Sequence, residues 1–142
     1  MAEALLRHAL AAESPPLCEL EVTSGGLAAA PGMPISENTV RSLQKTGLDI
    51  SSHQSRPVTQ ELVNRSLLIL CMTTSHEQLL RTHFQVDATN VCKMMDMVPD
   101  GDLSRIDIPD PVGGDLSAYE TVRDCMVEAI PHVVQYLKND ST

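Results

Sequence analysis

The chain has 142 residues, a formal net charge of −9, 42% hydrophobic residues and only 2% aromatic ones. This length suits one domain of ordinary size, with a core of aliphatic side chains. The negative charge argues against binding to nucleic acid or to an anionic membrane surface, because both attract an excess of lysine and arginine. No apolar run reaches the roughly 18 residues of a membrane-spanning helix.

The first predicted elements are a helix and a strand. Leu5, Leu6 and Leu10 recur at helical spacing within Ala2–Ala12, which predicts an amphipathic helix whose charged residues, Glu3 and Arg7 among them, face solvent. After two prolines, Leu17–Ser24 alternates polar and apolar residues and meets a pair of glycines. This pattern predicts a short strand that ends in a loop.

Helices and strands alternate through the rest of the sequence. Apolar runs predict strands at Ser66–Met72 and Asn90–Met95, and the first is continuous, as in a strand buried on both faces of a parallel sheet. A helix is expected at Glu37–Thr46, between a Ser36 cap and Gly47, and another at Gln60–Asn64 after a Thr59 cap. Further helices are expected from Ser75 and at Ala118–Leu137, the last with a kink at Pro131. This alternation predicts an α/β fold with a parallel sheet.

The carboxyl edge of that sheet is where ligands bind in open α/β folds. Residues 23–32, 71–78 and 107–119 are expected to reach it. In the last of these, Asp110 precedes Pro111 and a glycine pair that allows a tight reversal. Such a loop can hold a carboxyl group over a site, as a general acid requires. The same pattern also fits a turn that merely leads into a helix.

The remaining reactive residue types give weaker signals. Five histidines show no metal-ligand spacing, and His53 is expected to make structural hydrogen bonds. Ser24 lacks the G-x-S-x-G context of a nucleophile. Four scattered cysteines without a Cys-x-x-Cys pair are typical of reduced cytoplasmic thiols that pack as small hydrophobes. We therefore expect no metal, no cofactor and a cytoplasmic location.

Several stretches together resemble one enzyme family. "MAEALLRHAL", "TSGG", "LILCMTTSH" and "DPVGGDLSAYETVRD" have the order and spacing of the low-molecular-weight protein-tyrosine-phosphatase family, which includes bacterial protein-arginine phosphatases. The run "GLDISSHQSRPVT" is similar to the same family, so the likeness covers essentially the whole chain. The resemblance implies a flavodoxin-like, three-layer αβα fold around a parallel sheet.

The resemblance also implies a mechanism and a set of site residues. In the family, a Cys-x5-Arg loop after the first strand supplies a thiolate that attacks phosphorus and an arginine that holds the phosphoryl oxygens. Asp110, before Pro111, matches the acid that protonates the leaving group. Ser24 matches a serine that orders the phosphate loop, and His53 lies in a segment that supports the same region.

The chain departs from the family at its start. It begins with the helix that follows the phosphate loop, and no cysteine has an arginine six positions later. The resemblance therefore implies an N-terminally truncated single domain, residues 1–142, without the central first strand and without activity. Exposed sheet edges would then favour self-association.

Three explanations of this departure stay open. An internal methionine has been taken as the start of an active phosphatase, the chain is a pseudophosphatase that binds partners, or it is half of a split enzyme. The substrate would be a phosphorylated protein or a small phosphomonoester. Val112 and Gly113 stand where tyrosine-directed members carry aromatic residues, which weakens phosphotyrosine and leaves phosphoarginine open.

Overall fold

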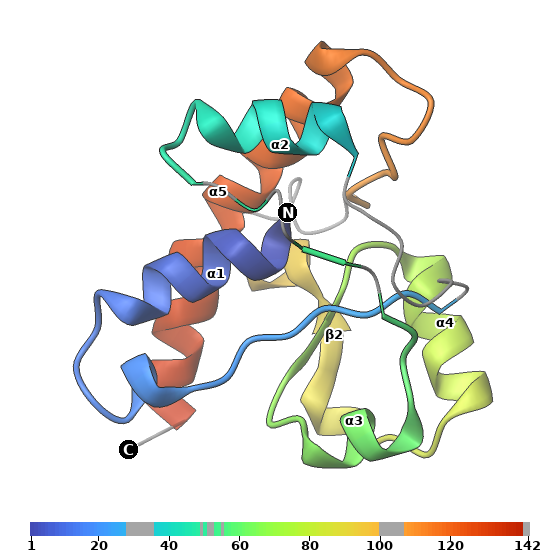
Figure 1. Ribbon diagram of the computed structural model, residues 1–142. Helices are drawn as coiled ribbons and strands as arrows, with labels where there is room; N and C mark the ends of the chain where they lie inside the picture. Colours follow the sequence, from blue (N-terminus) through green and yellow to red (C-terminus); the bar gives the residue numbers. More distant parts are fainter. Residues whose placement is uncertain (28–35, 49, 51–52, 55, 100–106, 141–142) are drawn as a thin grey trace.

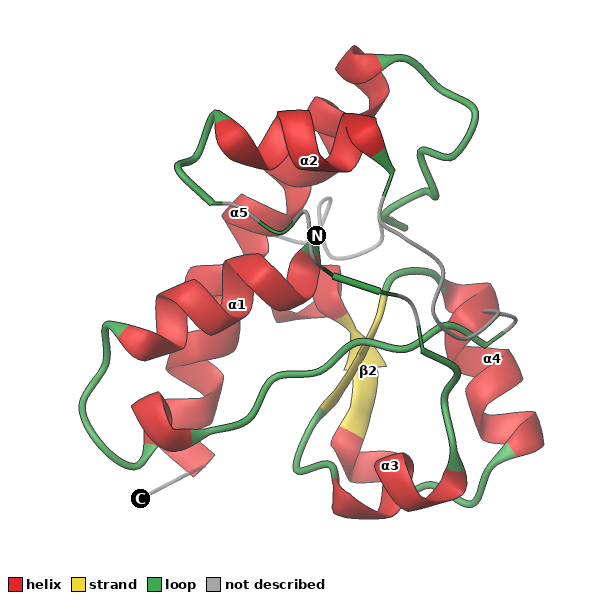
Figure 2. Ribbon diagram, in the orientation of Figure 1, coloured by secondary structure: helices red, strands yellow, loops and turns green. Residues whose placement is uncertain are grey.

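The computed structural model describes residues 1–27, 36–48, 50, 53–54, 56–99 and 107–140. Its α-helices and strands are α1 (Ala2–Ala11), α2 (Glu37–Gln44), α3 (Gln60–Arg65), β1 (Ile69–Cys71), α4 (Thr74–His83), β2 (Val91–Lys93) and α5 (Leu116–Asp140). Single 3-10 turns form at η1 (Leu17–Glu19), η2 (Ala88–Asn90) and η3 (Met94–Met97). Figure 2 shows these elements coloured by type.

Strands β1 and β2 form a parallel pair at the centre of the molecule. Ile69 lies opposite Val91, and Cys71 lies opposite Lys93. Figure 1 shows α1 and α5 on one side of the strands and α3 and α4 on the other. The predicted α/β class with helices on both faces of a parallel sheet is therefore confirmed.

Two hydrophobic clusters flank the strands. The larger one joins α1, α2, η3 and α5 and includes the fully buried Leu43, Met94 and Val133. The smaller one joins α3, α4 and the other face of the strands around Val63 and Leu80. The larger cluster contributes most of the apolar burial and so most of the hydrophobic stabilisation.

Helix α5 spans 25 residues, longer at both ends than the predicted Ala118–Leu137. It passes through Pro131 without ending, because buried residues on either side, Ile130 and Val133, hold it to the core. Within the described part of the chain, no helix is both long enough and apolar enough to cross a membrane.

The strand predicted at Leu17–Ser24 is wrong. Leu17–Glu19 forms a 3-10 turn after Pro16, and the residues that follow are extended but carry no strand pairing. The first ladder contact comes at Gly26, which exchanges backbone hydrogen bonds with Arg56 and Val58. Alternation alone cannot make a strand, because each edge also needs a partner for its backbone groups.

The predicted helix caps depend on local chemistry and are confirmed. The hydroxyls of Ser36 and Thr59 each accept a hydrogen bond from a backbone N–H of the helix that follows. Gly47 has a φ of +82°, the left-handed conformation that favours glycine after a helix. The helix expected from Ser75 begins instead at Thr74, because the hydroxyl of Thr73 caps it.

Candidate functional site

The carboxyl edge of the sheet brings together two of the three expected segments, and residues 28–32 of the third lie outside the described residues. The Ile108 N–H donates to the carbonyl of Met72, directly after β1, over 2.8 Å. The Ile108 side chain is 1% exposed and belongs to the larger hydrophobic cluster. The Asp-Pro segment is thus fixed where β1 ends, as the sequence predicts.

Asp107 fastens the same segment through its carboxylate. Its Oδ1 accepts from the Thr74 backbone N–H at 3.0 Å, the Thr74 hydroxyl at 3.1 Å and the Lys93 ammonium at 3.2 Å. The backbone hydrogen bond from Thr74, followed by that from Lys93, holds the pKa of Asp107 below its ordinary value. The carboxylate therefore stays charged at the first turn of α4, where the helix dipole favours an anion.

Asp110 stands on a tight turn just beyond this anchor. Its Oδ1 accepts from the Val112 N–H at 3.0 Å, and the Gly114 N–H donates to the Pro111 carbonyl at 2.8 Å. Gly113 has a φ of +85°, which the turn requires and glycine adopts without strain. The Asp110 side chain is exposed, so the turn presents an ordered carboxyl group to solvent.

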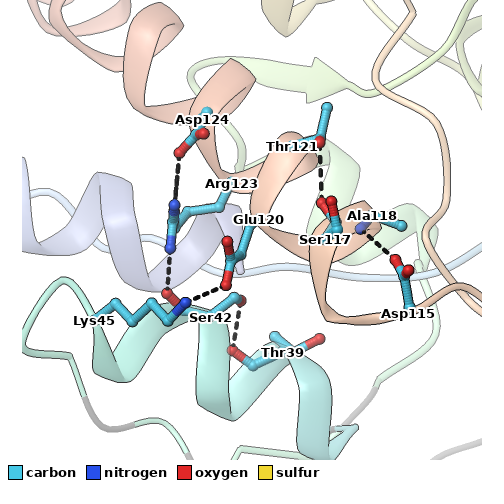
Figure 3. Close-up of polar contacts among 10 residues, drawn as sticks. All are labelled: Thr39, Ser42, Lys45, Asp115, Ser117, Ala118, Glu120, Thr121, Arg123 and Asp124. Atoms are coloured by element: carbon cyan, nitrogen blue, oxygen red, sulfur yellow. Dashed lines mark hydrogen bonds and ion pairs between the residues drawn. The ribbon is translucent and has the colours of Figure 1, made fainter.

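Helix α5 begins directly after this turn, and Figure 3 shows polar contacts of its first half with α2. Asp115 caps α5 by accepting from the Ala118 N–H at 3.0 Å. Further along α5, Arg123 donates to the Ser42 carbonyl of α2 at 2.9 Å, and Glu120 pairs with Lys45. Helix α2 therefore braces the element from which the Asp110 turn emerges.

A second polar cluster surrounds Glu3 in the first turn of α1. The Ser24 hydroxyl donates to Glu3 Oε2 at 2.5 Å, and Arg7 pairs with Oε1 while donating to the Val22 carbonyl at 2.8 Å. His53 Nδ1 lies 3.9 Å from Oε2. Figure 1 shows the N-terminus, where α1 begins, near the middle of the view and above β2.

Glu3 is the residue that sequence reasoning missed. It was expected to face solvent, yet it is 8% exposed. Burial raises the pKa of Glu3, but hydrogen bonds from Ser24 and Arg7, with the charges of Arg7 and His53, outweigh burial and leave that pKa below 4.5. The spacing of Glu3 and Arg7 places both on one helix face but does not indicate whether that face is buried.

The two clusters remain separate. Ser24 and His53, which the sequence singles out far apart, meet through Glu3. Among the described residues, no hydrogen bond or ion pair joins Asp110 to these three side chains. Pro111, half-buried, stays with Asp110 on its turn.

Three of the four thiols have raised pKa values. Burial, followed by the nearby Glu77 carboxylate and the Cys92 thiol, raises the pKa of Cys71 to about 11. Burial and the carboxylates of Asp96 and Glu77 raise the pKa of Cys92 to about 11. Cys125 shifts in the same direction, again by burial first, and Cys18 is exposed. A nucleophilic thiol needs a lowered pKa, so these three shifted cysteines behave as packing residues.

Comparison with known proteins supports the sequence resemblance. The family model for low molecular weight phosphotyrosine protein phosphatase matches residues 1–142. A protein-arginine-phosphatase of Bacillus subtilis is 29% identical over 140 residues, covering 99% of this chain and 89% of the relative. A probable low molecular weight protein-tyrosine-phosphatase, EpsP, of Ralstonia nicotianae is 32% identical over 120 residues, covering 84% of this chain and 74% of the relative.

Solved structures agree with the fold. An arginine phosphatase from Geobacillus stearothermophilus superimposes with a TM-score of 0.83 at 25% identity, covering 98% of this chain and 84% of the other. A low molecular weight protein tyrosine phosphatase from T. tengcongensis gives a TM-score of 0.83 at 26% identity, covering 95% of this chain and 88% of the other. The chain therefore belongs to the low molecular weight phosphotyrosine protein phosphatase family.

Proposed function

We propose that this fold serves the hydrolysis of phosphorylated protein side chains, with Asp110 as the general acid. The observation that carries the proposal is the turn at Asp110, which orders an exposed carboxyl group at the carboxyl edge of the sheet. A general acid must reach the leaving atom of the substrate without being buried itself. Pro111 stiffens the turn because its ring fixes its own φ and restricts the residue before it.

We propose a supporting role for Ser24 and His53. Both contact the Glu3 carboxylate at the N-terminal end of α1, where free backbone N–H groups can meet phosphoryl oxygens. In this proposal they set the position of that helix end and do not touch substrate.

The proposed chemistry also needs a nucleophile that these 142 residues do not provide. No Cys-x5-Arg occurs in the sequence, and the Cys71 and Cys92 thiols have raised pKa values. Loss of a covalent nucleophile costs on the order of 10^6 in kcat in proteases. A general acid contributes only about 10^2- to 10^4-fold. We therefore propose that the 142-residue chain alone is inactive.

Phosphoarginine is the substrate we favour. Val112, which follows Asp110 and Pro111, is 76% exposed and aliphatic, so this position offers no aromatic wall for a tyrosine ring. The name of the Bacillus subtilis relative, protein-arginine-phosphatase, points the same way. The name of the Ralstonia relative keeps phosphotyrosine as the alternative substrate.

The test adds a nucleophile. A strand followed by the family's Cys-x5-Arg loop is fused before Met1, or supplied as a separate peptide, and hydrolysis of phosphoarginine and p-nitrophenyl phosphate is measured. We expect activity from the fusion, and none from the 142-residue chain. Hydrolysis by the chain alone that disappears in Asp110→Asn would refute the need for an added nucleophile.

A binding function is the second candidate, because the sequence itself holds no Cys-x5-Arg. A fusion that folds but hydrolyses neither substrate, while the 142-residue chain binds phosphorylated protein, would favour this candidate. Reading the DNA upstream of the Met1 codon in frame separates the explanations further. Codons for a strand followed by Cys-x5-Arg would favour the enzyme.

We also propose that the chain resides in the cytoplasm and self-associates. The location is supported by the four cysteines, which are free thiols. In the described sheet β1 pairs only with β2, which leaves its outer edge able to accept another strand. Size-exclusion chromatography across a range of concentrations tests association, and a monomer throughout that range would contradict it.

A further inference from the structure

We propose that Lys93 and Asp107 are positioning residues that set where Asp110 stands. This inference rests on the proposed role of Asp110 as a general acid. It concerns a connection between the sheet and residues 107–112, called the acid loop below. The side chains that make this connection lie outside the family motifs in the sequence. Neither residue is proposed to touch substrate.

Lys93 is a charged residue in a buried place. It is the last residue of β2, is 9% exposed, and directs its Nζ to Asp107 Oδ1 at 3.2 Å. A buried ammonium group is costly unless a carboxylate compensates it. The Asp107 carboxylate, whose side chain is 44% exposed, supplies this compensation at the end of β2.

Asp107 connects that ammonium group to the neighbouring strand. The same oxygen accepts from the backbone N–H and hydroxyl of Thr74, the first residue of α4 after β1. One residue further, the Ile108 N–H binds the Met72 carbonyl. The acid loop is thus tied to the ends of both strands within two residues.

The chain between this anchor and Asp110 is stiff. Pro109 and Pro111 flank Asp110, and each proline fixes its own φ and restricts the residue before it. The Asp110 carboxylate then binds the Val112 N–H, which limits its own rotation. A shift at Asp107 is therefore passed on to Asp110, because the three intervening peptide units have little freedom to absorb it.

The first test uses the 142-residue chain. Amide hydrogen exchange at Ile108, Thr74 and Val112 is compared between wild type, Lys93→Met and Asp107→Asn, with Lys138→Met, which breaks the ion pair with Glu13, as the control. We expect faster exchange at all three amides in Lys93→Met and Asp107→Asn, and unchanged exchange there in Lys138→Met. Unchanged exchange in folded Lys93→Met and Asp107→Asn would overturn the proposal.

The second test uses the active fusion and asks for a signature of lost proton donation. kcat/KM is measured for p-nitrophenyl phosphate and for phenyl phosphate, whose leaving oxygen is more basic. Misplacement of a catalytic group by about 1 Å can cost about 100-fold in rate. We therefore expect kcat/KM of Lys93→Met and Asp107→Asn to fall by about 10- to 100-fold for phenyl phosphate and by less for p-nitrophenyl phosphate. Lys93→Arg, which keeps the charge, should recover part of the loss.

The two hypotheses fail in different ways. If Asp110→Asn leaves phenyl phosphate hydrolysis unchanged, the general-acid role itself is wrong. The other outcome is that Asp110→Asn lowers phenyl phosphate hydrolysis as expected while Lys93→Met and Asp107→Asn lower the hydrolysis of both substrates equally. In that case the Lys93–Asp107 pair acts only on stability, and the positioning role is wrong.

Discussion

Glu3 and Asp110 are two carboxyl groups of one molecule in opposite surroundings. Glu3 is 8% exposed and engages Ser24 and Arg7, whereas Asp110 is exposed and, among the described residues, binds only the backbone N–H of Val112. The Ser24 hydroxyl, which donates to Glu3, and Arg7, which also donates to the Val22 carbonyl, connect segment 20–24 to α1. Asp110 keeps an oxygen accessible, and a proton donor needs such an atom.

The buried Glu3 carboxylate suits a role in stability, whereas the exposed Asp110 carboxyl group suits a role in catalysis. Charged hydrogen bonds in a buried cluster stabilise the fold, and loss of one leaves its partners unsatisfied. An exposed carboxylate in an ordered turn contributes little to stability but is free to meet a substrate. Substitutions at the two positions should therefore change different measurements.

The largest expected effect is that of Asp110→Asn in the active fusion. Loss of the acid should lower kcat/KM for phenyl phosphate by about 10^2- to 10^4-fold. The melting temperature should hardly change, because the asparagine side-chain oxygen can still accept from the Val112 N–H. Asp124→Asn, at an exposed position on α5, is the matched control. Equal kcat/KM values in Asp110→Asn and Asp124→Asn would show that Asp110 has no special part in the chemistry.

Glu3→Gln should have the second largest effect, on stability. The neutral amide keeps one acceptor but loses the charge that faces Arg7 and His53, and hydrogen bonds to charged groups contribute about 1.5–3 kcal/mol. Urea unfolding should show a loss of that size. Glu37→Gln, which breaks an exposed ion pair with Arg41, should cost well below 1 kcal/mol. A similar small loss in Glu3→Gln would show that the cluster is not a stability centre.

Ser24→Ala should act in the same direction as Glu3→Gln but less strongly. It removes the donor 2.5 Å from Glu3 Oε2, and a typical hydrogen bond contributes about 1 kcal/mol net. The exchange of backbone amides in segment 20–24 should also quicken, because this hydroxyl connects the segment to α1. Thr121→Ala, which removes a hydroxyl bond within α5, is the control.

The sequence predicted the parts of the molecule that local chemistry decides. The cap at Ser36, the reversal at Gly113 and the exposed Asp110 turn follow from residue types a few positions apart. The strand at Leu17–Ser24 failed because strand formation depends on a distant partner.

The parts that the sequence could not predict are contacts between distant segments. Glu3 is buried because segment 20–24 crosses over the first turn of α1, and the spacing of Glu3 and Arg7 reads equally well as an exposed pair. Lys93 and Asp107 come from different elements, and only the fold brings them within hydrogen-bond distance. Tertiary contacts of this kind leave no periodic trace in the sequence.

The smallest expected effect is the pH dependence of the Glu3 cluster. Because the pKa of Glu3 in the folded chain lies below the ordinary value of 4.5, its contribution to stability is fully present above about pH 4.5. That contribution is lost as the pH falls through the folded pKa, since protonation discharges the carboxylate that faces Arg7. Unfolding free energies from pH 7 to pH 3 should therefore fall more steeply in wild type than in Glu3→Gln, whose amide does not titrate. Parallel curves would mean that the Glu3 carboxylate titrates alike in the folded and unfolded chain, which would contradict a stabilising role for its charge.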